Sequence, residues 1–229
     1  MEMLQVREKE IFDTLKKIKG KKFVIIGGYA VNAYTFPRFS VDCDIVVKDE
    51  IELGEIEKKL IQSGYEKKPL DNLDMPYHGK FERYEKEITN GLKVSMDILV
   101  KEILDRQTKV SFSAAWVFQN SKIRVLKGKT IQEKIKLRII NTDALFVMKM
   151  ISCRPTDIRD CFMLATTIKN KEWIRQEVSE RYDFNDRFSK IKDKIFSKQF
   201  RDGLQGIFGF IDARIFDKHK TCILQLKGD

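Results

Sequence analysis

The sequence predicts an α+β fold in which an α/β half is followed by a mainly helical half. In the first half, short apolar runs rich in β-branched residues alternate with segments whose apolar residues recur at helical spacing. After residue 140 the apolar spacing is almost entirely three and four, which predicts helices. The chain has 229 residues, 42% of them hydrophobic, so it can bury a large core. No Pro-, Gly- or Ser-rich linker divides it, and we expect a core domain over 1–140 with a helical region over 141–229 packed on it.

Helices are predicted where apolar residues repeat every three or four positions. The first such pattern ends at Gly20 and the third at Gly64, because glycine commonly follows a helix end. Asn141 or Thr142 is a typical N-cap, and Pro155 is typical of a first helical turn. The expected helices cover 3–19, 29–34, 51–61, about 142–153, 155–168 and further segments to about Ser197.

Strands are predicted where apolar runs are short or alternate with polar residues. The run 23–26 is apolar throughout, which is typical of a strand buried on both faces, and Gly27-Gly28 ends it. Thr89-Asn90-Gly91 lies between two extended segments, and an Asn-Gly pair there indicates a hairpin. Irregular structure is expected at 69–75 and around Trp116. The expected strands cover 23–26, 42–47, 65–68, 80–88, 92–100, 123–126 and 135–140.

The composition is strongly basic. Lys and Arg number 44 against 34 Asp and Glu, giving a net charge of +10, which favours a polyanionic partner such as RNA, DNA or nucleotides. A solvated Lys-rich surface would give the same charge. The segment 121–140 is the best candidate polyanion surface, although its alternation of basic and apolar residues also fits an ordinary half-exposed strand. Its basic residues are Lys122, Arg124, Lys127, Lys129, Lys134, Lys136 and Arg138.

Other classes of protein are disfavoured. No apolar run approaches the roughly 20 residues that span a bilayer, and residues 1–10 do not resemble a secretory signal, so we expect a cytoplasmic protein with no membrane association. The four cysteines form no C-x-x-C pair and both histidines are isolated, which argues against zinc and disulfides. Cys43 is expected in the core and His78 in solvent. Phe112, Trp116 and Phe118 are expected to pack, with base stacking as the alternative.

The residues that carry chemistry begin at the glycine pair. Gly27 and Gly28 would let a backbone approach a phosphate closely, at the start of a helix whose N–H groups favour anions. The pattern Arg38-x-Ser40-x-Asp42-x-Asp44 follows, and carboxylates two apart on a strand share one face. Two such carboxylates repel each other unless a cation or a proton lies between them. We therefore expect Asp42 and Asp44 to bind a divalent cation.

A third carboxylate would complete the cluster. Asp97 alternates with apolar residues in a predicted strand, and beside Asp42 and Asp44 it would allow two Mg²⁺ ions to be held about 4 Å apart for displacement at phosphorus. One ion would activate the attacking oxygen and the other would stabilise the leaving pyrophosphate. Arg38, Ser40 and the glycine backbone would bond phosphate oxygens.

Together these motifs resemble the nucleotidyltransferase superfamily of the polymerase-β type, and in particular the AbiEii-like toxins and related GG-type enzymes. The resemblance covers about residues 23–164. It includes the glycine pair, Arg-x-Ser-x-Asp-x-Asp, the later strand Asp, a Leu-x-x-x-Lys helix at 145–149 and an Arg-x-x-Asp-x-x-Asp helix at 154–160. The glycine pair departs from the Gly-Ser of many polymerase-β-type enzymes, which leaves Ser40 as the nearer hydroxyl. The implied fold is a nucleotidyltransferase-type mixed sheet flanked by helices.

The resemblance also implies site residues. The metal-binding and catalytic carboxylates would be Asp42, Asp44 and Asp97, with Asp97 a candidate base for the attacking hydroxyl. Lys149 would join Arg38 and Ser40 at the nucleotide's phosphates, and Asp157 or Asp160 would support that pocket. The alternative for these two acids is ion pairing with Arg154 or Lys149, because the predicted helix places Asp157, Asp160 and Leu164 on one face.

The activity so implied is transfer of NMP from an NTP such as ATP or GTP to an acceptor hydroxyl, with Mg²⁺ or Mn²⁺. The basic segment 121–140 favours RNA, such as a tRNA end, as the acceptor, and a toxin would imply a cognate antitoxin. Two alternatives remain open. One is modification of a small hydroxylated molecule, as in antibiotic nucleotidyltransferases, and the other is a noncatalytic nucleotide- or RNA-binding module.

Overall fold

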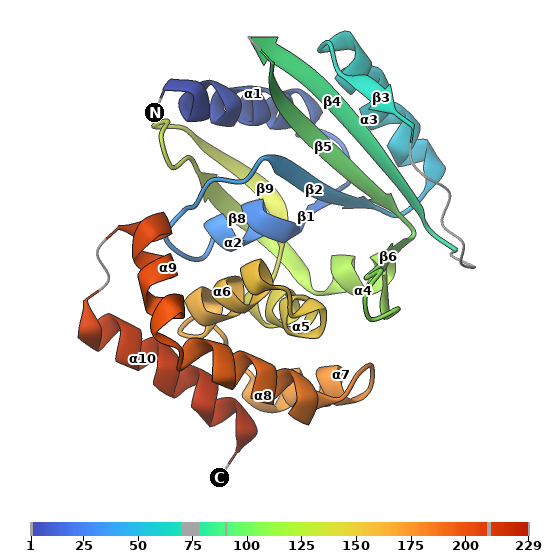
Figure 1. Ribbon diagram of the computed structural model, residues 1–229. Helices are drawn as coiled ribbons and strands as arrows, with labels where there is room; N and C mark the ends of the chain where they lie inside the picture. Colours follow the sequence, from blue (N-terminus) through green and yellow to red (C-terminus); the bar gives the residue numbers. More distant parts are fainter. Residues whose placement is uncertain (1, 70–77, 90, 210–211, 229) are drawn as a thin grey trace. The chain divides into compact units, whose positions relative to one another are not determined.

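The computed structural model describes residues 2–69, 78–89, 91–209 and 212–228 of the chain. They divide into two compact units, each treated by itself (Figure 1). The core unit comprises 1–33, 39–104 and 111–140. The helical unit comprises 141–229 together with two short segments from the first half, 34–38 and 105–110.

A seven-stranded mixed sheet forms the centre of the core unit, in the order β3-β4-β5-β2-β1-β9-β8. β2 pairs in parallel with β5, and β1 in parallel with β9, whereas the other neighbours are antiparallel. A separate two-stranded sheet pairs β6 with β7. The strands are β1 (Val24–Ile25), β2 (Asp42–Val47), β3 (Glu66–Lys68), β4 (Lys80–Thr89), β5 (Leu92–Val100), β6 (Glu102–Leu104), β7 (Ser111–Ser113), β8 (Ser121–Lys127) and β9 (Lys134–Ile140).

Helices cover both faces of this sheet (Figure 1). α1 (Glu2–Ile18) and α3 (Glu50–Gln62) lie on one face, and α2 (Gly27–Asn32) and α4 (Ala114–Gln119) on the other. α1 buries one stripe, including Ile11, Leu15 and Ile18, as the apolar spacing requires. The N-terminus of α3 is capped by Asp49, whose Oδ1 accepts hydrogen bonds from two backbone N–H groups.

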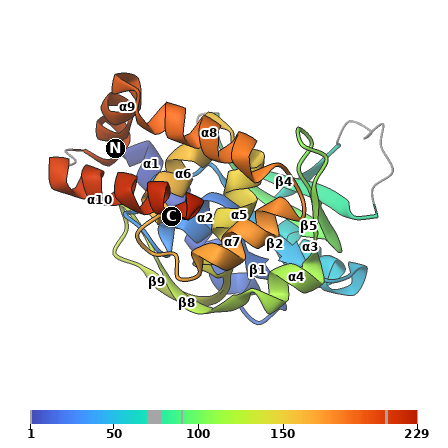
Figure 2. The same cartoon turned by 90° about the horizontal axis from the view of Figure 1, so that it is seen from below.

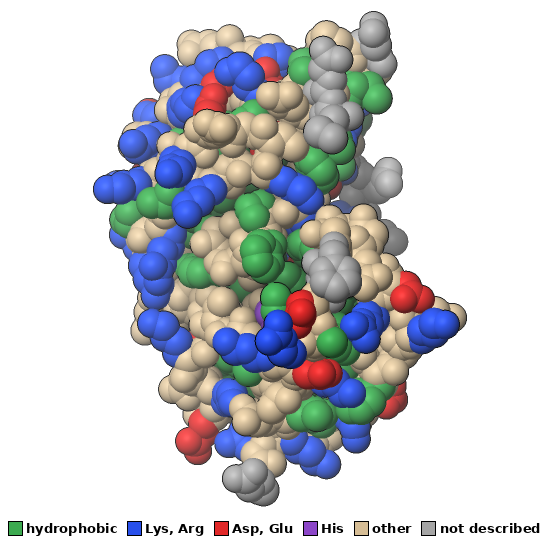
Figure 3. All heavy atoms as spheres, turned by 90° about the vertical axis from the view of Figure 1, so that its left-hand side faces the viewer, with side chains coloured by type: hydrophobic (Ala, Val, Ile, Leu, Met, Phe, Trp, Pro, Cys, Tyr) green, Lys and Arg blue, Asp and Glu red, His purple; other side chains and the backbone are tan. Residues whose placement is uncertain are grey.

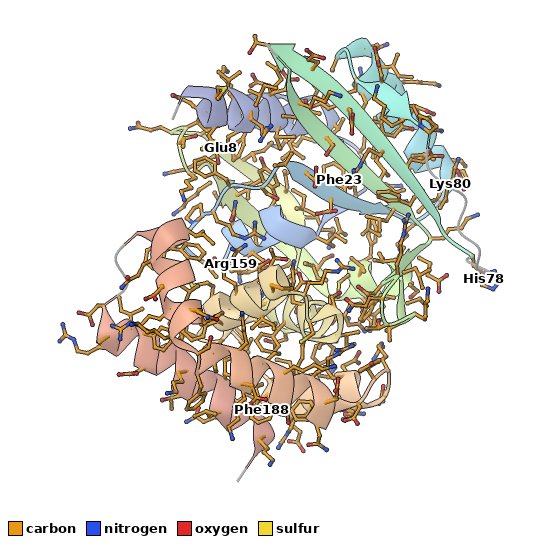
Figure 4. All side chains as sticks on the ribbon, viewed as in Figure 1. Glu8, Phe23, His78, Lys80, Arg159 and Phe188 are labelled. Atoms are coloured by element: carbon orange, nitrogen blue, oxygen red, sulfur yellow. The ribbon has the colours of Figure 1, made fainter. Side chains whose placement is uncertain are left out.

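A buried carboxylate on α1 fixes the loop between β8 and β9. Glu8 is 5% exposed (labelled in Figure 4). It accepts hydrogen bonds from the backbone N–H groups of Lys129, Thr130 and Ile131 and from the Thr130 hydroxyl. Four loop donors are thereby satisfied by one side chain, which anchors the β8–β9 hairpin to the helix.

The helical unit contains six α-helices and a 3₁₀ turn among its described residues (Figure 2). Asn141 caps α5 by accepting a hydrogen bond from the Ala144 N–H, as the sequence predicts. Phe162 lies at the centre of an aromatic cluster with Phe200, Phe216 and His219. The helices are α5 (Thr142–Ser152), α6 (Pro155–Leu164), α7 (Lys171–Ser179), α8 (Phe184–Ile195), α9 (Lys198–Phe208) and α10 (Ala213–Leu224), followed by η1 (Gln225–Lys227).

The predicted fold class is confirmed, with three local corrections. The glycine pair does not end a strand but forms the start of α2, which begins at Gly27 and ends at Asn32. The segment around Trp116 is not irregular, because Ser113 caps a short helix there. The helix opened by Pro155 ends at Leu164 rather than near residue 168. The predicted loop at 69–75 lies almost wholly outside the described residues.

Two other properties follow from the described residues. None of their helices has the length and apolarity needed to cross a bilayer. Lys and Arg side chains outnumber Asp and Glu on the face drawn in Figure 3, in keeping with the net charge of +10.

Candidate active site

Strand register brings the three predicted metal-binding carboxylates to one face of the sheet. β2 and β5 are adjacent and parallel, and Asp44 is the register partner of Asp97. Register partners on neighbouring strands point to the same side, and Asp42 shares that side because it lies two residues from Asp44. We call Asp42, Asp44 and Asp97 the carboxylate face.

Asp42 and Asp44 are held differently. Asp42 Oδ1 accepts a hydrogen bond from the hydroxyl of Ser95, its register partner on β5. Asp44 lies against Gly27 of α2, where a Cβ would collide with Asp44 Oδ2. Gly27 also has a φ of 62°, in the left-handed region that favours glycine. The glycine is therefore required for α2 to approach the carboxylate.

Asp97 is bound by an arginine from the next strand. Arg83 on β4 is its register partner, and Arg83 Nε and Nη2 lie 2.9 and 2.6 Å from the two carboxylate oxygens. Burial raises the pKa of Asp97, which is 4% exposed, and the nearby Asp42 raises it further, whereas Arg83 opposes both effects. The Arg83 guanidinium thus occupies a place where a cation is favourable.

The chemistry of this donor set fits a divalent metal ion. Carboxylate oxygens are the ligands that Mg²⁺ and Mn²⁺ prefer. The side chains nevertheless do not converge in the arrangement seen here, since no group of three His, Cys, Asp or Glu among the described residues is placed to hold a metal. Both Asp97 oxygens are instead engaged by Arg83.

The other predicted phosphate ligands divide between the units. Gly28 is buried within α2, so only Gly27 of the pair is partly accessible. The Ser40 hydroxyl donates to the backbone carbonyl of Asp42 at 3.1 Å, which fixes the segment that precedes β2 to the first residue of that strand. Arg38 and Lys149 belong to the helical unit.

Arg38 and Lys149 join two carboxylates in what we call the buried ion-pair cluster of the helical unit. Arg38 Nε and Nη2 each lie 2.8 Å from an oxygen of Asp160, which is 0% exposed. Lys149 Nζ lies 2.7 Å from Asp157 Oδ1 and 3.0 Å from Asp160 Oδ2. The cluster thus pairs two cations with two carboxylates from segments far apart in the sequence.

The pKa shifts show how strongly the cluster is coupled. Burial alone would lower the pKa of Lys149, but Asp160 and Asp157 outweigh it and raise that pKa. Burial alone would raise the pKa of Asp160, but Lys149 and Arg38 lower it. Both groups are therefore held in their charged forms at neutral pH.

A third cation, Arg159 on α6 (labelled in Figure 4), is electrostatically coupled to this cluster. Burial and the neighbouring Arg38 lower its pKa, whereas Asp160 and Asp157 oppose the shift. Within the described residues its buried Nε finds no hydrogen-bond acceptor.

The predicted pairing alternatives are resolved in part. Asp157 and Asp160 pair with Lys149, whereas Arg154 Nη2 instead lies 2.7 Å from Asp105 Oδ2. Asp157 also accepts a hydrogen bond from the Arg154 backbone N–H at the start of α6. The catalytic roles proposed for Lys149 and Asp157 remain predictions.

Sequence reasoning missed Arg83, Ser95 and Glu85, which share the carboxylate face. Ser95 on β5 has two register partners, Asp42 on β2 and Glu85 on β4. The hairpin signal at residues 89–91 could have placed β4 beside β5. It could not have given the register, because an irregularity between Glu87 and Thr89 shifts the pairing by one residue.

Cys43, His78 and Phe112, for which the sequence predicts no role in catalysis, lie where expected. Cys43 is fully buried on the opposite face of β2 from its acidic neighbours. His78 lies exposed just before β4 (Figure 4). Phe112 packs against Trp116, with ring centroids 4.9 Å apart.

Solved structures resemble this fold. No protein-family model matches the chain, and no curated protein sequence matches it. JHP933 from Helicobacter pylori aligns with 99% of this chain and 92% of its own at 15% identity and a TM-score of 0.54. A candidate nucleotidyltransferase from H. pylori aligns over the same shares at 14% identity and a TM-score of 0.52. The lincosamide antibiotic adenylyltransferase LnuA is also similar, at 20% identity over 70% of this chain and 97% of its own, with a TM-score of 0.45.

The two H. pylori structures define the class of fold. Their alignments span nearly the whole chain, so this protein has a nucleotidyltransferase-type fold, with a mixed sheet flanked by helices and further helices toward the C-terminus. At these sequence identities the likeness concerns the fold alone, and function has to be argued from the site.

Proposed function

We propose that the chain is a metal-dependent nucleotidyltransferase, which transfers NMP from an NTP to an acceptor hydroxyl. The observation that carries the proposal is the carboxylate face, where Asp44 and Asp97 are partners on adjacent parallel strands and Asp42 lies beside them. Clustered negative charge of this kind gives nothing to a protein that only binds anions. It serves a protein that binds cations, and through them a triphosphate.

In this proposal the carboxylates hold one or two Mg²⁺ or Mn²⁺ ions. When bound, the ions would neutralise the triphosphate and favour ionisation of the attacking hydroxyl. Asp97 lies on the same side of the sheet as Asp42 and Asp44, and it would accept the hydroxyl proton once released from Arg83. The Gly27 backbone would border the phosphates, since α2 starts against Asp44.

At phosphorus, the reaction forms one bond and breaks one. The acceptor oxygen bonds to the α-phosphorus of the NTP, and the bond from that phosphorus to the bridging oxygen breaks, so pyrophosphate leaves with its electron pair. The hydroxyl proton passes to Asp97. The assignment of Arg38, Ser40 and Lys149 to phosphate binding belongs to the same proposal and follows from the resemblance in the motifs.

We further propose RNA, including a tRNA end, as the acceptor. Support comes from the net charge of +10 and from β8 and β9, where Lys134, Lys136 and Arg138 are exposed while the residues between them are buried. The motif resemblance to AbiEii-like toxins would make the protein a toxin with a cognate antitoxin. Small hydroxylated molecules remain the alternative acceptor, because the motif is shared with antibiotic-modifying enzymes.

An assay with α-³²P-labelled NTPs and total RNA tests the proposal. We expect label in RNA with one of the four nucleotides in Mg²⁺ or Mn²⁺, and a loss of at least about 10³-fold in Asp44→Ala, because the metal-binding carboxylate is removed. Asp217→Ala, at an exposed carboxylate on α10, is the matched control and should label RNA normally. Labelling by a folded Asp44→Ala variant at the wild-type rate would overturn the proposed site.

A further inference from the structure

A large groove lies in the core unit at the end of β2 opposite Asp42. Its volume is about 1140 Å³, above the range of roughly 300–1,000 Å³ usual for small-molecule sites. The turns after α1 and β2, helix α4 and the strands β8 and β9 form its walls. We call it the basic groove; its lining residues of either charge are Lys19, Lys21, Lys22, Lys48, Asp49, Glu52, Lys136 and Arg138.

Positive charge dominates this lining, with six cations against two carboxylates. Asp49 caps α3, and Glu52 accepts from the Lys22 backbone N–H and also lies 3.7 Å from the Lys22 ammonium, so the two carboxylates compensate at most one of the six cations. Among the described residues, Lys19, Lys48 and Lys136 have no carboxylate within ion-pair distance, and all three are exposed. Like charges gathered without counter-ions are unfavourable, so an anion would stabilise this arrangement.

The groove also has apolar surface beside the charges. Phe23 and Leu137 are buried, whereas Ile123 on β8 is 58% exposed. Phe118 of α4 lies beneath Lys48, with Nζ 4.9 Å from the ring centroid. Phe23, labelled in Figure 4, directly precedes β1. Cations interleaved with aromatic and aliphatic surface suit a ligand that carries phosphates and flat bases together.

We propose that the basic groove binds the phosphate backbone of single-stranded RNA. Five of its six cations are lysines, which act as point charges on phosphates, whereas carboxylates are best matched by the forked geometry of arginine. This favours RNA over an acidic protein segment. Single strands are bound by positively charged grooves with aromatic surface, without the need for helical groove geometry.

The position of the groove gives RNA a defined path. β2 runs from Asp42 in the carboxylate face to Val47, next to Lys48 in the groove, a length of about 20 Å. An RNA strand bound at Lys48 can therefore extend several nucleotides toward the carboxylates. That the gripped RNA is the acceptor rests on the proposed function, whereas its binding to the groove does not.

Binding of a 5′-fluorescein-labelled RNA of about 12 nucleotides tests the proposal. Anisotropy would be followed on the full chain at several KCl concentrations, without metal or NTP. We expect Lys136→Glu/Arg138→Glu to weaken binding by about tenfold or more and to reduce the slope of log K against log salt by about 1.4. Lys19→Glu/Lys22→Glu changes the opposite wall, outside the sheet, and should act in the same direction. It keeps the test valid if the strand variant does not fold.

The matched control is Lys58→Glu/Lys59→Glu, which makes the same change of charge at two exposed positions on α3. It should bind RNA within about twofold of wild type, because only nearby charges count at physiological salt. Equal weakening by the control would show that only net charge matters and would overturn the groove. The groove proposal would also be overturned if both groove variants bound RNA as tightly as wild type, or if poly-glutamate bound the protein as tightly as the RNA does.

Failure of the proposed function gives a different result. Asp42→Asn/Asp44→Asn should retain RNA binding in metal-free buffer, because it leaves the basic groove intact. If wild-type protein binds RNA through the groove but labels no acceptor, the transferase proposal fails and the groove stands. If transfer to RNA occurs while the groove variants bind and react as wild type, the groove proposal alone fails.

Discussion

The carboxylate face and the buried ion-pair cluster use the same residue types with opposite balances of charge. In the cluster, each of Asp157 and Asp160 lies within 3.0 Å of a cationic nitrogen. In the carboxylate face, Arg83 is the one cation that forms an ion pair with Asp97 among the described residues, while Asp42 accepts from a hydroxyl. The ion pairs of the cluster compensate one another, with Arg159 as a further cation beside them, whereas the acidic surplus of the carboxylate face is stabilised by an added cation. The comparison therefore separates an internally paired cluster, whose loss should cost stability, from a surface that an added cation would stabilise.

The largest effect that would sharpen this contrast is expected for Asp160→Asn. The substitution leaves Arg38 and Lys149 buried beside one carboxylate, and removing one partner from a buried ion pair typically costs about 3–5 kcal/mol. Urea unfolding at pH 7 measures it. The control Asp193→Asn, at an exposed position on α8, should stay within about 0.5 kcal/mol of wild type. An Asp160→Asn variant as stable as this control would contradict the structural role of the cluster.

The same cluster gives a pH dependence. The pKa of Asp160 is lowered by Lys149 and Arg38 against the effect of burial, so its contribution to stability is present above its unfolded pKa of about 3.9 and is lost as pH falls through the folded value. Wild type should therefore lose stability more steeply below pH 4 than Asp160→Asn does. If the free energies of unfolding of the two proteins fell in parallel in acid, Asp160 would not be the source of this pH dependence.

The next effect concerns the carboxylate face, through Gly27→Ala. The new Cβ would collide with Asp44 Oδ2, and the φ of 62° would strain any L-residue by about 1–2 kcal/mol. We expect transfer activity to fall about 100-fold, since small displacements at a reacting centre have effects of this size. Gly54→Ala on α3 is the control, because nothing lies within 4 Å of its added Cβ. Normal activity in Gly27→Ala would separate Asp44 from the chemistry.

The smallest effect is expected from Arg83→Gln. Loss of the guanidinium frees both oxygens of Asp97, so we expect Mn²⁺ to bind about tenfold more tightly, as seen by electron paramagnetic resonance of the free ion. Lys80→Gln removes the same charge from the same strand, on the side that pairs with Glu82, and should leave Mn²⁺ binding unchanged. Weaker Mn²⁺ binding in Arg83→Gln would indicate that Arg83 organises the site rather than competing for it.

The sequence predicts the parts of the carboxylate face that depend on local periodicity. Alternation puts Asp42 and Asp44 on one side of β2 and Cys43 on the other, and burial of Cys43 agrees with this. The pairing of Asp97 with Arg83 depends instead on one residue of register. A hairpin continuing from the pair Thr89–Leu92 without irregularity would set Asp97 opposite Tyr84, and the observed shift sets it opposite Arg83.

The ion-pair cluster could be predicted from the sequence to a smaller extent. Arg38 and Asp160 are 122 residues apart, and neither helix spacing nor strand alternation links them. The pairing of Lys149 with Asp157 and Asp160 was one alternative that helix spacing suggested, because residues three apart share a helix face. Tertiary packing selected it, and it also directed Arg154 to Asp105.

The short central strand β1 has a consequence for the β8–β9 hairpin. Two residues form β1, and Ile25 with Ile139 is the single register pair between β1 and β9 among the described residues. Such a short ladder offers little resistance to twisting. The orientation of the hairpin therefore depends also on its tip, where Glu8 accepts hydrogen bonds from three successive backbone N–H groups. One carboxylate on the first helix thereby helps to position Lys136 and Arg138, the two cations that the hairpin contributes to the basic groove.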